Sequence, residues 1–226
     1  MSGDPTAHLD PDARKALQTV LGLLAEERAS VSSIVDERAW TVHVVDSLTG
    51  LEVPALRSAM TIADIGSGAG FPGLPLAVAL PRARVDLIES VGRKCDFIER
   101  AIESVGLANA NVLNARSEEI AGGAGREAYQ VVTARAVGRL STLAELASPL
   151  LREEGVLVAW KGRRDEGEES QLDRAAEALA MRPERIVDVG DRAGSRHRHL
   201  HVIRKADQTP PDLPRRPGVA KKRPRG

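Results

Sequence analysis

A glycine-rich segment carries the strongest chemical signal in the sequence. It reads D-I-G-S-G-A-G-F-P-G over residues 64–73. Glycines let a backbone approach a ligand closely and turn through positive φ, and a following helix would offer unpaired N–H groups at its start. An acid, Glu89, comes 23 residues after Gly66, where a carboxylate at the end of the next strand accepts hydrogen bonds from ribose hydroxyls. The pattern predicts a site for an adenosine-containing cofactor.

Two cofactors fit this pattern. The spacing G-x-G-x-G, with an acid just before it, is similar to the S-adenosylmethionine turn of class I methyltransferases; the residues concerned are Asp64, Gly66, Gly68 and Gly70. The overlapping spacing G-x-G-x-x-G, which ends at Gly73, also satisfies the dinucleotide pattern, and Glu89 lies 21 residues after Gly68. The alternative to a methyltransferase is therefore an NAD(P)-dependent oxidoreductase, and a purely structural turn is a third interpretation.

A cofactor-binding turn of this kind needs a strand before it and a helix after it. Apolar runs predict strands at 61–65, 84–89, 111–113, 129–133, 156–160, 185–189 and 200–204. Helical spacing predicts helices at 73–80, 93–105, 140–151 and 166–180. This alternation predicts an α/β fold with a doubly wound parallel sheet. The short loop 190–198 predicts an antiparallel pair at the end, which favours the methyltransferase, as does the helical lead-in before the turn.

Three regions follow from the composition. Residues 1–58 form an N-terminal helical region, with one helix starting at Asp10-Pro11 and another over 36–48. Residues 59–205 form the predicted methyltransferase domain. Residues 206–226 hold five prolines and six basic residues with few apolar ones, which predicts a flexible tail.

The net charge of zero is the sum of two parts with opposite charge. The chain has 32 Lys and Arg against 32 Asp and Glu. From residue 191 onward there are 11 basic residues and 3 acids, a balance of +8, so the first 190 residues carry −8. A basic end of this kind indicates a polyanionic partner.

Composition also excludes several classes of protein. Cys95 is the only cysteine, which rules out an internal disulfide and a multi-cysteine metal site. The alternating residues His197, His199 and His201 stand among arginines, so we predict no metal. The longest uncharged run, 65–81, is too short for a membrane span. We expect a cytoplasmic protein without an export leader and without a large exposed apolar interface, and therefore a monomer.

The sequence resembles the ribosomal small-subunit methyltransferase G family (RsmG), also called GidB. The stretch Asp64–Pro75, D-I-G-S-G-A-G-F-P-G-L-P, is similar to the family motif. Further matching pieces are His43 with Asp46-Ser47-Leu48, Leu87–Ser90, Arg93-Lys94, Arg116 with Glu118-Glu119, Arg135-Ala136, Lys161-Gly162, and Arg198-His199-Leu200 with Ile203 and Lys205. The resemblance covers about residues 10–205, and the order and spacing of the pieces together make it specific.

The resemblance implies a fold, a reaction and a set of site residues. Members of the family use S-adenosylmethionine to methylate N7 of one guanine, family position 527, in 16S rRNA of the small ribosomal subunit. By resemblance, the residues that contact the cofactor are Gly66, Phe71, Ser117, Glu118 and Arg135. Glu89 would hold the ribose hydroxyls, which agrees with its spacing.

The expected chemistry needs no general base. Guanine N7 has an in-plane lone pair and no proton, so the rate can come from positioning and desolvation. We therefore predict no catalytic residue in the strict sense, and we name His43, Lys161 and Arg198 as candidates for positioning the substrate. A methyltransferase-like protein that binds RNA without catalysis is the remaining alternative.

The sequence departs from the family in two places. Many members have Asn-Leu-Thr where this chain has Ala29-Ser30-Val31, so any role of that asparagine is absent or moved. The basic segment after residue 206 extends beyond the usual end of the family.

Overall fold

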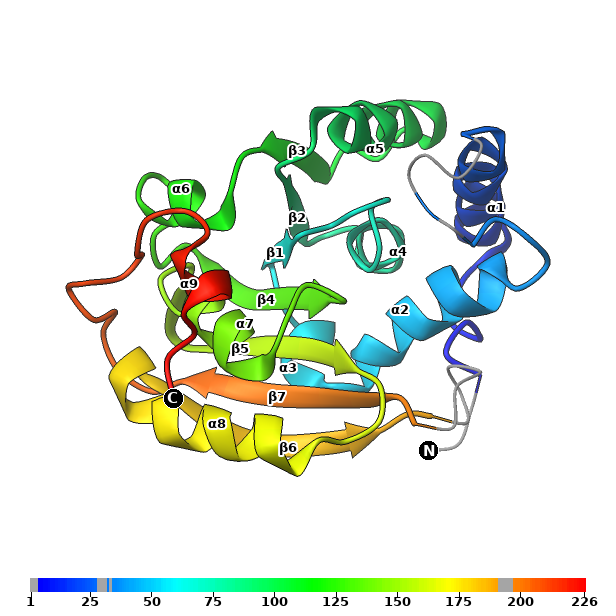
Figure 1. Cartoon of the computed structure of the whole chain (residues 1–226). Helices are drawn as coiled ribbons and strands as arrows, with labels where there is room; N and C mark the ends of the chain where they lie inside the picture. The colour runs from blue at the N-terminus through cyan, green and yellow to red at the C-terminus, as the bar shows by residue number, and fades with distance from the viewer. Residues whose placement is uncertain (1–3, 28–31, 33, 191–196) are drawn as a thin grey trace.

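The computed structural model describes residues 4–27, 32, 34–190 and 197–226. The departure from the family at Ala29–Val31 lies outside these residues. Strands of one sheet are β1 (Thr61–Ile65), β2 (Arg84–Glu89), β3 (Ala110–Asn114), β4 (Tyr129–Arg135), β5 (Leu151–Lys161), β6 (Met181–Asp188) and β7 (His199–Lys205). They lie in the order β3-β2-β1-β4-β5-β7-β6 (Figure 1).

The first five strands are parallel and the last two run against them. Pairs among β1 to β5 are parallel, whereas β7 is antiparallel to both β5 and β6. The predicted doubly wound α/β sheet with an antiparallel C-terminal pair is thus confirmed. The predicted bounds of β1 and β2 match those in the structure.

Helices surround the sheet. The longer ones are α1 (Pro11–Glu26), α4 (Gly73–Ala79), α5 (Gly92–Val105), α7 (Leu140–Ala147) and α8 (Glu166–Ala176). The shorter ones are η1 (Trp40–Val45), α2 (Asp46–Leu48), η2 (Thr49–Glu52), α3 (Pro54–Arg57), α6 (Ser117–Ala121), η3 (Glu177–Leu179) and α9 (Val219–Lys222). None of the described helices is long and apolar enough to cross a membrane.

Two apolar cores lie on the two faces of the sheet. On one face, residues of α1, α4 and α5 pack against alternate strand residues such as Ile62 and Val131. On the other face, α7 and α8 pack against the intervening residues, including Ala63 and Val132. Because both faces are covered, the central strands are continuous apolar runs. The N-terminal helices pack over the carboxyl ends of β4 and β5, where Asp46 contacts Arg135 and Trp160.

The N-terminal region shares the core of the sheet. Val20 and Leu24 of α1 belong to the same buried cluster as Ile62. Trp160, in β5, donates a hydrogen bond from its indole nitrogen to the backbone oxygen of Asp46 at 2.8 Å. A helix was expected over 36–48; the chain is helical from Trp40 to Leu48, where η1 runs directly into α2, and the short helices η2 and α3 follow.

Some strands and helices differ in length from the prediction. β5 begins at Leu151 instead of residue 156, and α7 ends at Ala147 instead of residue 151. The first part of β5 is charged and exposed, so it lacks an apolar pattern, yet Leu151 still pairs with Tyr129 of β4. The short helix α6 was not predicted.

The C-terminal segment, residues 206–226, differs from the flexible tail that its composition predicts. It lies against the body of the protein, where α9 packs beside α7 (Figure 1). Leu213 and Ala220 are each only 2% exposed, and Arg215 forms an ion pair with Glu145 of α7. Composition averages over the segment, whereas two buried side chains and specific polar contacts are enough to hold it.

Candidate active site

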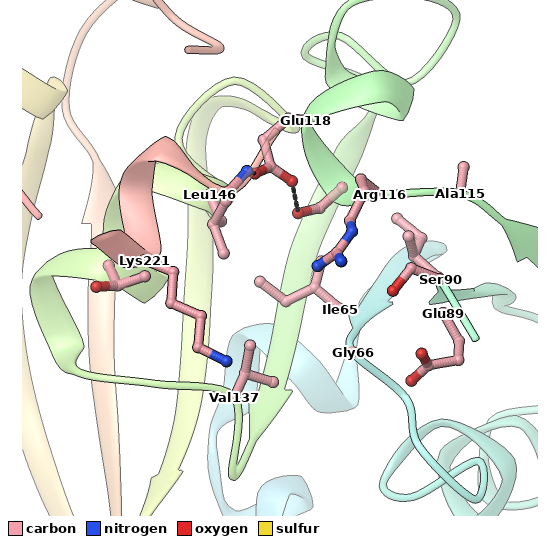
Figure 2. A pocket seen from close by; sticks show the side chains of 14 residues that line it. Ile65, Gly66, Glu89, Ser90, Ala115, Arg116, Glu118, Val137, Leu146 and Lys221 are labelled. Carbon is pink, nitrogen blue, oxygen red and sulfur yellow. Dashed lines mark hydrogen bonds between the residues drawn. The ribbon is translucent and has the colours of Figure 1, made fainter. Parts of the chain in front are cut away.

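A pocket opens at the carboxyl ends of β1, β2, β3 and β4 (Figure 2). Gly66 follows β1, Glu89 ends β2, Ser117 and Glu118 follow β3, and Val137 follows β4. The strand order reverses at β1, which lies between β2 and β4. Open α/β sheets bind ligands at this reversal, so the pocket occupies the expected place for a cofactor.

Gly66 forms the floor of the pocket. Its N–H donates to the backbone oxygen of Ile88 at 2.8 Å, and its φ of +64° is unfavourable for other residues. A Cβ atom built on Gly66 would lie 2.8 Å from Cγ2 of Val137. Only glycine therefore leaves this cradle open for a ligand.

Asp64 supports the glycine turn from beneath and does not line the pocket. It is fully buried; its Oδ1 accepts a hydrogen bond from the Thr133 hydroxyl at 2.8 Å, and its Oδ2 accepts one from the Gly73 N–H at 3.1 Å. Burial raises the pKa of Asp64 to about 6, although these hydrogen bonds favour the charged form. Its oxygens fix the path of the turn into α4.

Glu89 lies across the pocket floor from the turn. The Gly68 N–H donates to its Oε2 and the Val91 N–H donates to its Oε1, both at 2.9 Å. Its side chain extends toward the turn at Gly66 (Figure 2). Each carboxylate oxygen can accept a second hydrogen bond, so Glu89 can still receive two hydroxyl donors. The open cradle and this acid together fit an adenosine.

Ser117 and Glu118 begin α6 and form the next wall. The Ser117 hydroxyl donates to Oε2 of Glu118 at 3.2 Å. The other carboxylate oxygen, Oε1, accepts a hydrogen bond from the Gly218 N–H at 2.8 Å. Gly218 and Lys221 also line the pocket, so the C-terminal segment contributes to this site.

A buried charged cluster lies at the end of β4. Arg135 donates from Nη1 to Oδ2 of Asp46 at 2.9 Å and to the backbone oxygen of Val42 at 2.8 Å. Arg198 donates from Nη2 to the same Asp46 oxygen at 3.0 Å. Burial lowers the pKa of Arg135, and the Asp46 carboxylate opposes that shift. One carboxylate therefore holds two cations at the edge of the site.

Phe71 and His43 form a stack beside this cluster. Their ring centroids are 4.5 Å apart with an interplanar angle of 20°, and the Arg135 guanidinium carbon lies 5.8 Å from the Phe71 centroid. His43 donates from Nε2 to the backbone oxygen of Ile34 at 2.8 Å. Burial lowers the pKa of His43, so its ring is neutral near pH 7.

Lys161, at the end of β5, is held by contacts within the protein. Its Nζ pairs with Oε1 of Glu168 at 2.6 Å and donates to the Gly138 backbone oxygen at 3.0 Å. The same Glu168 oxygen accepts a hydrogen bond from the Leu140 N–H at 2.6 Å. Lys161 thus braces the loop between β4 and α7, whose residue Val137 borders the cofactor pocket.

The predicted residues fall into two neighbouring groups. One lines the pocket and comprises Gly66, Glu89, Ser117 and Glu118. The other is joined by contacts around the β4 end and comprises His43, Phe71, Arg135 and Arg198. Gly68 and Gly70 shape the turn between them, both with positive φ. In the described residues no cluster of three or more His, Cys, Asp or Glu side chains is suited to a metal ion.

Sequence reasoning missed several residues of the site. Val137 carries no signal beyond its place after a strand. Asp46 was noted as part of a matching piece, but nothing in its neighbourhood predicts two arginine partners 89 and 152 residues away. Gly218 and Lys221 lie in the segment that composition assigned to a flexible tail.

The fold and the pocket define a class I methyltransferase that uses S-adenosylmethionine. The family model described as "rRNA small subunit methyltransferase G" matches residues 17–200. The chain belongs to this family.

Relatives with the same description extend over nearly the whole chain. The ribosomal RNA small subunit methyltransferase G of Rubrobacter xylanophilus is 41% identical, with 96% of this chain and 88% of that protein covered. The protein of that name from Moorella thermoacetica is 35% identical, with 99% and 95% covered. The expectation that the segment after residue 206 extends beyond the usual end of the family is therefore wrong for this relative, which covers that segment as well. These matches give no support to the nicotinamide-dependent alternative.

Solved structures show the same fold at low identity. A SAM dependent methyltransferase from Aquifex aeolicus has a TM-score of 0.56 at 18% identity and covers 87% of this chain and 98% of its own. The fibrillarin pre-rRNA processing protein of Methanococcus jannaschii has a TM-score of 0.57 at 15% identity, with 73% and 74% covered. At this identity the likeness concerns the fold alone.

Proposed function

We propose that this protein transfers a methyl group from S-adenosylmethionine to N7 of one guanine in 16S rRNA, at family position 527. The observation that carries the proposal is the cradle at Gly66 facing the carboxylate of Glu89, in a chain of the small-subunit methyltransferase G family. The family supplies the substrate class, and the pocket supplies the place for the methyl donor.

Residues of both groups would hold the cofactor. Glu89 offers acceptors for the ribose hydroxyls, and Gly66 lets the backbone approach them. Ser117 and Glu118 stand beside the position expected for the adenine. Phe71 and Arg135 would close the site on the side opposite the adenine. When bound, S-adenosylmethionine supplies an electrophilic methyl group on a sulfonium.

The chain's own part in the reaction is positioning and exclusion of water. Guanine N7 carries no proton to remove, so no side chain has to act as a general base. Phe71 is 4% exposed and its ring partner His43 is 6% exposed, so this aromatic pair is itself shielded from water and would help to exclude water from the reacting groups. A dry, rigid site holds the base in line with the methyl group and contributes several kcal/mol to the rate.

The RNA would be gripped by cations at the edge of the site. Asp46 fixes the guanidinium group of Arg198, and Glu168 fixes the ammonium group of Lys161. Both cations are therefore held in defined places. His43, neutral and stacked, would position the base without charge. Phosphate contacts of this kind make binding strongly dependent on salt.

We also propose that the protein works as a monomer in the cytoplasm, where the ribosomal subunit that it modifies resides. The large apolar side chains that are exposed in the described part of the chain are scattered: Met60, Val91 and Ile186. Single exposed apolar residues of this kind do not form an interface.

Labelled methyl transfer tests the proposal. The purified chain is incubated with methyl-labelled S-adenosylmethionine and either naked 16S rRNA or small-subunit particles that lack the modification. We expect label in 7-methylguanosine with at least one of the two substrates. Cofactor binding without any transfer to either would instead support a protein that binds RNA without catalysis.

A further inference from the structure

The C-terminal segment forms one wall of the cofactor pocket. Gly218 and Lys221 line it together with Gly66 and Glu89. The Lys221 side chain reaches from α9 across the pocket toward Val137 (Figure 2). The family model matches residues 17–200, and the relative from Moorella thermoacetica covers 99% of this chain, so the segment that forms this wall is covered by that relative.

The wall is anchored to the body at several points. Arg215 binds both carboxylate oxygens of Glu145, whose side chain is only 2% exposed. Arg126 donates from Nη1 to the backbone oxygen of Leu213 at 2.9 Å. Leu213 and Ala220 are buried. These contacts come from the protein's own residues, so the segment is held to the body independently of the pocket lining.

A second anchor fixes the start of the segment. Lys205, fully buried at the end of β7, donates from Nζ to the backbone oxygen of Ser148 and to the Thr209 hydroxyl, each at 2.7 Å. The Thr209 hydroxyl in turn donates to Oε1 of Glu127 at 2.6 Å. The chain therefore leaves the sheet in one defined direction, toward α6 and α7.

The segment also orients an acid of the pocket. The Gly218 N–H and the Ser117 hydroxyl donate to different oxygens of Glu118. A carboxylate held from both sides cannot rotate freely. Its free lone pairs then face a fixed direction, which suits recognition of an amino group such as that of adenine.

We propose that Lys221 is a cofactor-binding residue that donates a hydrogen bond to the adenosine part of S-adenosylmethionine, while Gly218 positions Glu118 for the same part. This inference rests on the proposed function. A lysine ammonium has three donors and no acceptor, and adenosine offers ring nitrogens and ribose oxygens as acceptors. Lys221 enters on the side of Glu118 and Val137, where the adenosine part is expected.

The test compares two adjacent lysines of α9 in the full-length chain. Both lysines are exposed, but only Lys221 lines the pocket. Binding of S-adenosylhomocysteine and of adenosine is measured by calorimetry for the wild type, Lys221→Met and Lys222→Met. We expect Lys221→Met to weaken both ligands by about tenfold, as for a hydrogen bond from a charged donor. Lys222→Met should match the wild type.

Each other result has a defined meaning. Equal binding by Lys221→Met and the wild type overturns the inference. Loss for S-adenosylhomocysteine alone also overturns it, because the ammonium would then serve the amino-acid end. Failure of the wild type to bind S-adenosylhomocysteine contradicts the proposed function instead.

A second variant tests the wall without touching the pocket. Arg215→Met removes the anchor on Glu145 and should loosen the segment, so trypsin should cleave faster after Lys221 and Lys222. We expect this variant to bind both ligands more weakly. Faster cleavage with unchanged binding would show that the wall contributes nothing to the cofactor site.

Discussion

The guanidinium of Arg135 is bonded to the carboxylate of Asp46 at 2.9 Å, which joins the end of β4 to the N-terminal helices. Asp46 is 1% exposed and also holds Arg198 of the loop before β7. Three parts of the chain that are far apart in the sequence thus meet on one carboxylate. The N-terminal helices are therefore part of the site as well as part of the core.

Asp46→Asn should destabilise the protein strongly. The substitution leaves Arg135 buried without its counter-charge, and removing one partner of a buried pair costs about 3–5 kcal/mol. Denaturant unfolding at neutral pH measures the change. Asp36→Asn is the matched control, since Asp36 pairs with Arg38 at the surface, and it should leave the unfolding free energy unchanged. Similar effects of both variants would show that the Asp46 cluster is not a buried charge site.

Gly66→Ala should weaken cofactor binding. The new methyl group would lie 2.8 Å from Val137 Cγ2 at a φ of +64°. The strain at such a backbone position is about 1–3 kcal/mol, and relieving it moves the backbone out of the cradle, so calorimetry with S-adenosylhomocysteine should show binding weaker by about 5- to 150-fold.

Gly22→Ala serves as the control for that variant. Gly22 lies in the middle of α1, where a Cβ meets nothing within 4 Å. Alanine there should stabilise the protein by about 0.5–1 kcal/mol and leave binding unchanged. If Gly66→Ala binds S-adenosylhomocysteine as tightly as Gly22→Ala does, the glycine at position 66 is not needed for cofactor binding.

Asp64→Asn should change how stability depends on pH. The pKa of Asp64 rises from 3.8 to about 6 on folding, so the folded protein holds the proton more tightly than the unfolded chain. Its contribution to stability is present below about pH 4 and is lost as the pH rises through about 6. The loss amounts to about 3 kcal/mol.

An uncharged amide at position 64 lacks this dependence. Unfolding free energies of the wild type and Asp64→Asn, measured from about pH 4 to pH 7, should therefore diverge in favour of the variant as the pH rises. Parallel curves would mean that Asp64 is already charged, without penalty, in the folded protein at low pH.

Lys161→Ala should impair use of the RNA more than binding of the cofactor. Lys161 is absent from the lining of the cofactor pocket and braces the β4–α7 loop through Gly138 and Glu168. Methyl transfer at varied RNA concentration should show a raised KM for RNA, whereas the Kd for S-adenosylhomocysteine should stay close to that of the wild type. Equal loss of both would mean that Lys161 acts by bracing the loop that borders the cofactor pocket, and would contradict its proposed contact with the RNA.

Local patterns were enough to predict the central sheet. The apolar runs of β1 and β2 and the glycines between them signal a strand, a turn and a helix within about 30 residues, and the bounds of these two strands match the structure. The acid Glu89 could be placed by spacing alone. These features depend on residues that are close together in the sequence, so a sequence pattern is enough to predict them.

Contacts between distant residues could not be predicted in this way. Arg135 and Arg198 reach Asp46 over 89 and 152 residues, and Gly218 reaches Glu118 over 100. The C-terminal segment has too few apolar residues to resemble a folded element. Its order comes from two buried side chains, from the ion pair of Arg215 with Glu145, and from hydrogen bonds to residues elsewhere in the chain.

The site of modification in cellular rRNA tests the central claim most directly. Small-subunit rRNA from cells with and without this protein is digested and the modified nucleotides are mapped. We expect 7-methylguanosine at one position, family position 527, in the first sample and unmodified guanine there in the second. Identical modification in both samples, or a difference at another base or another atom, would contradict the proposed reaction.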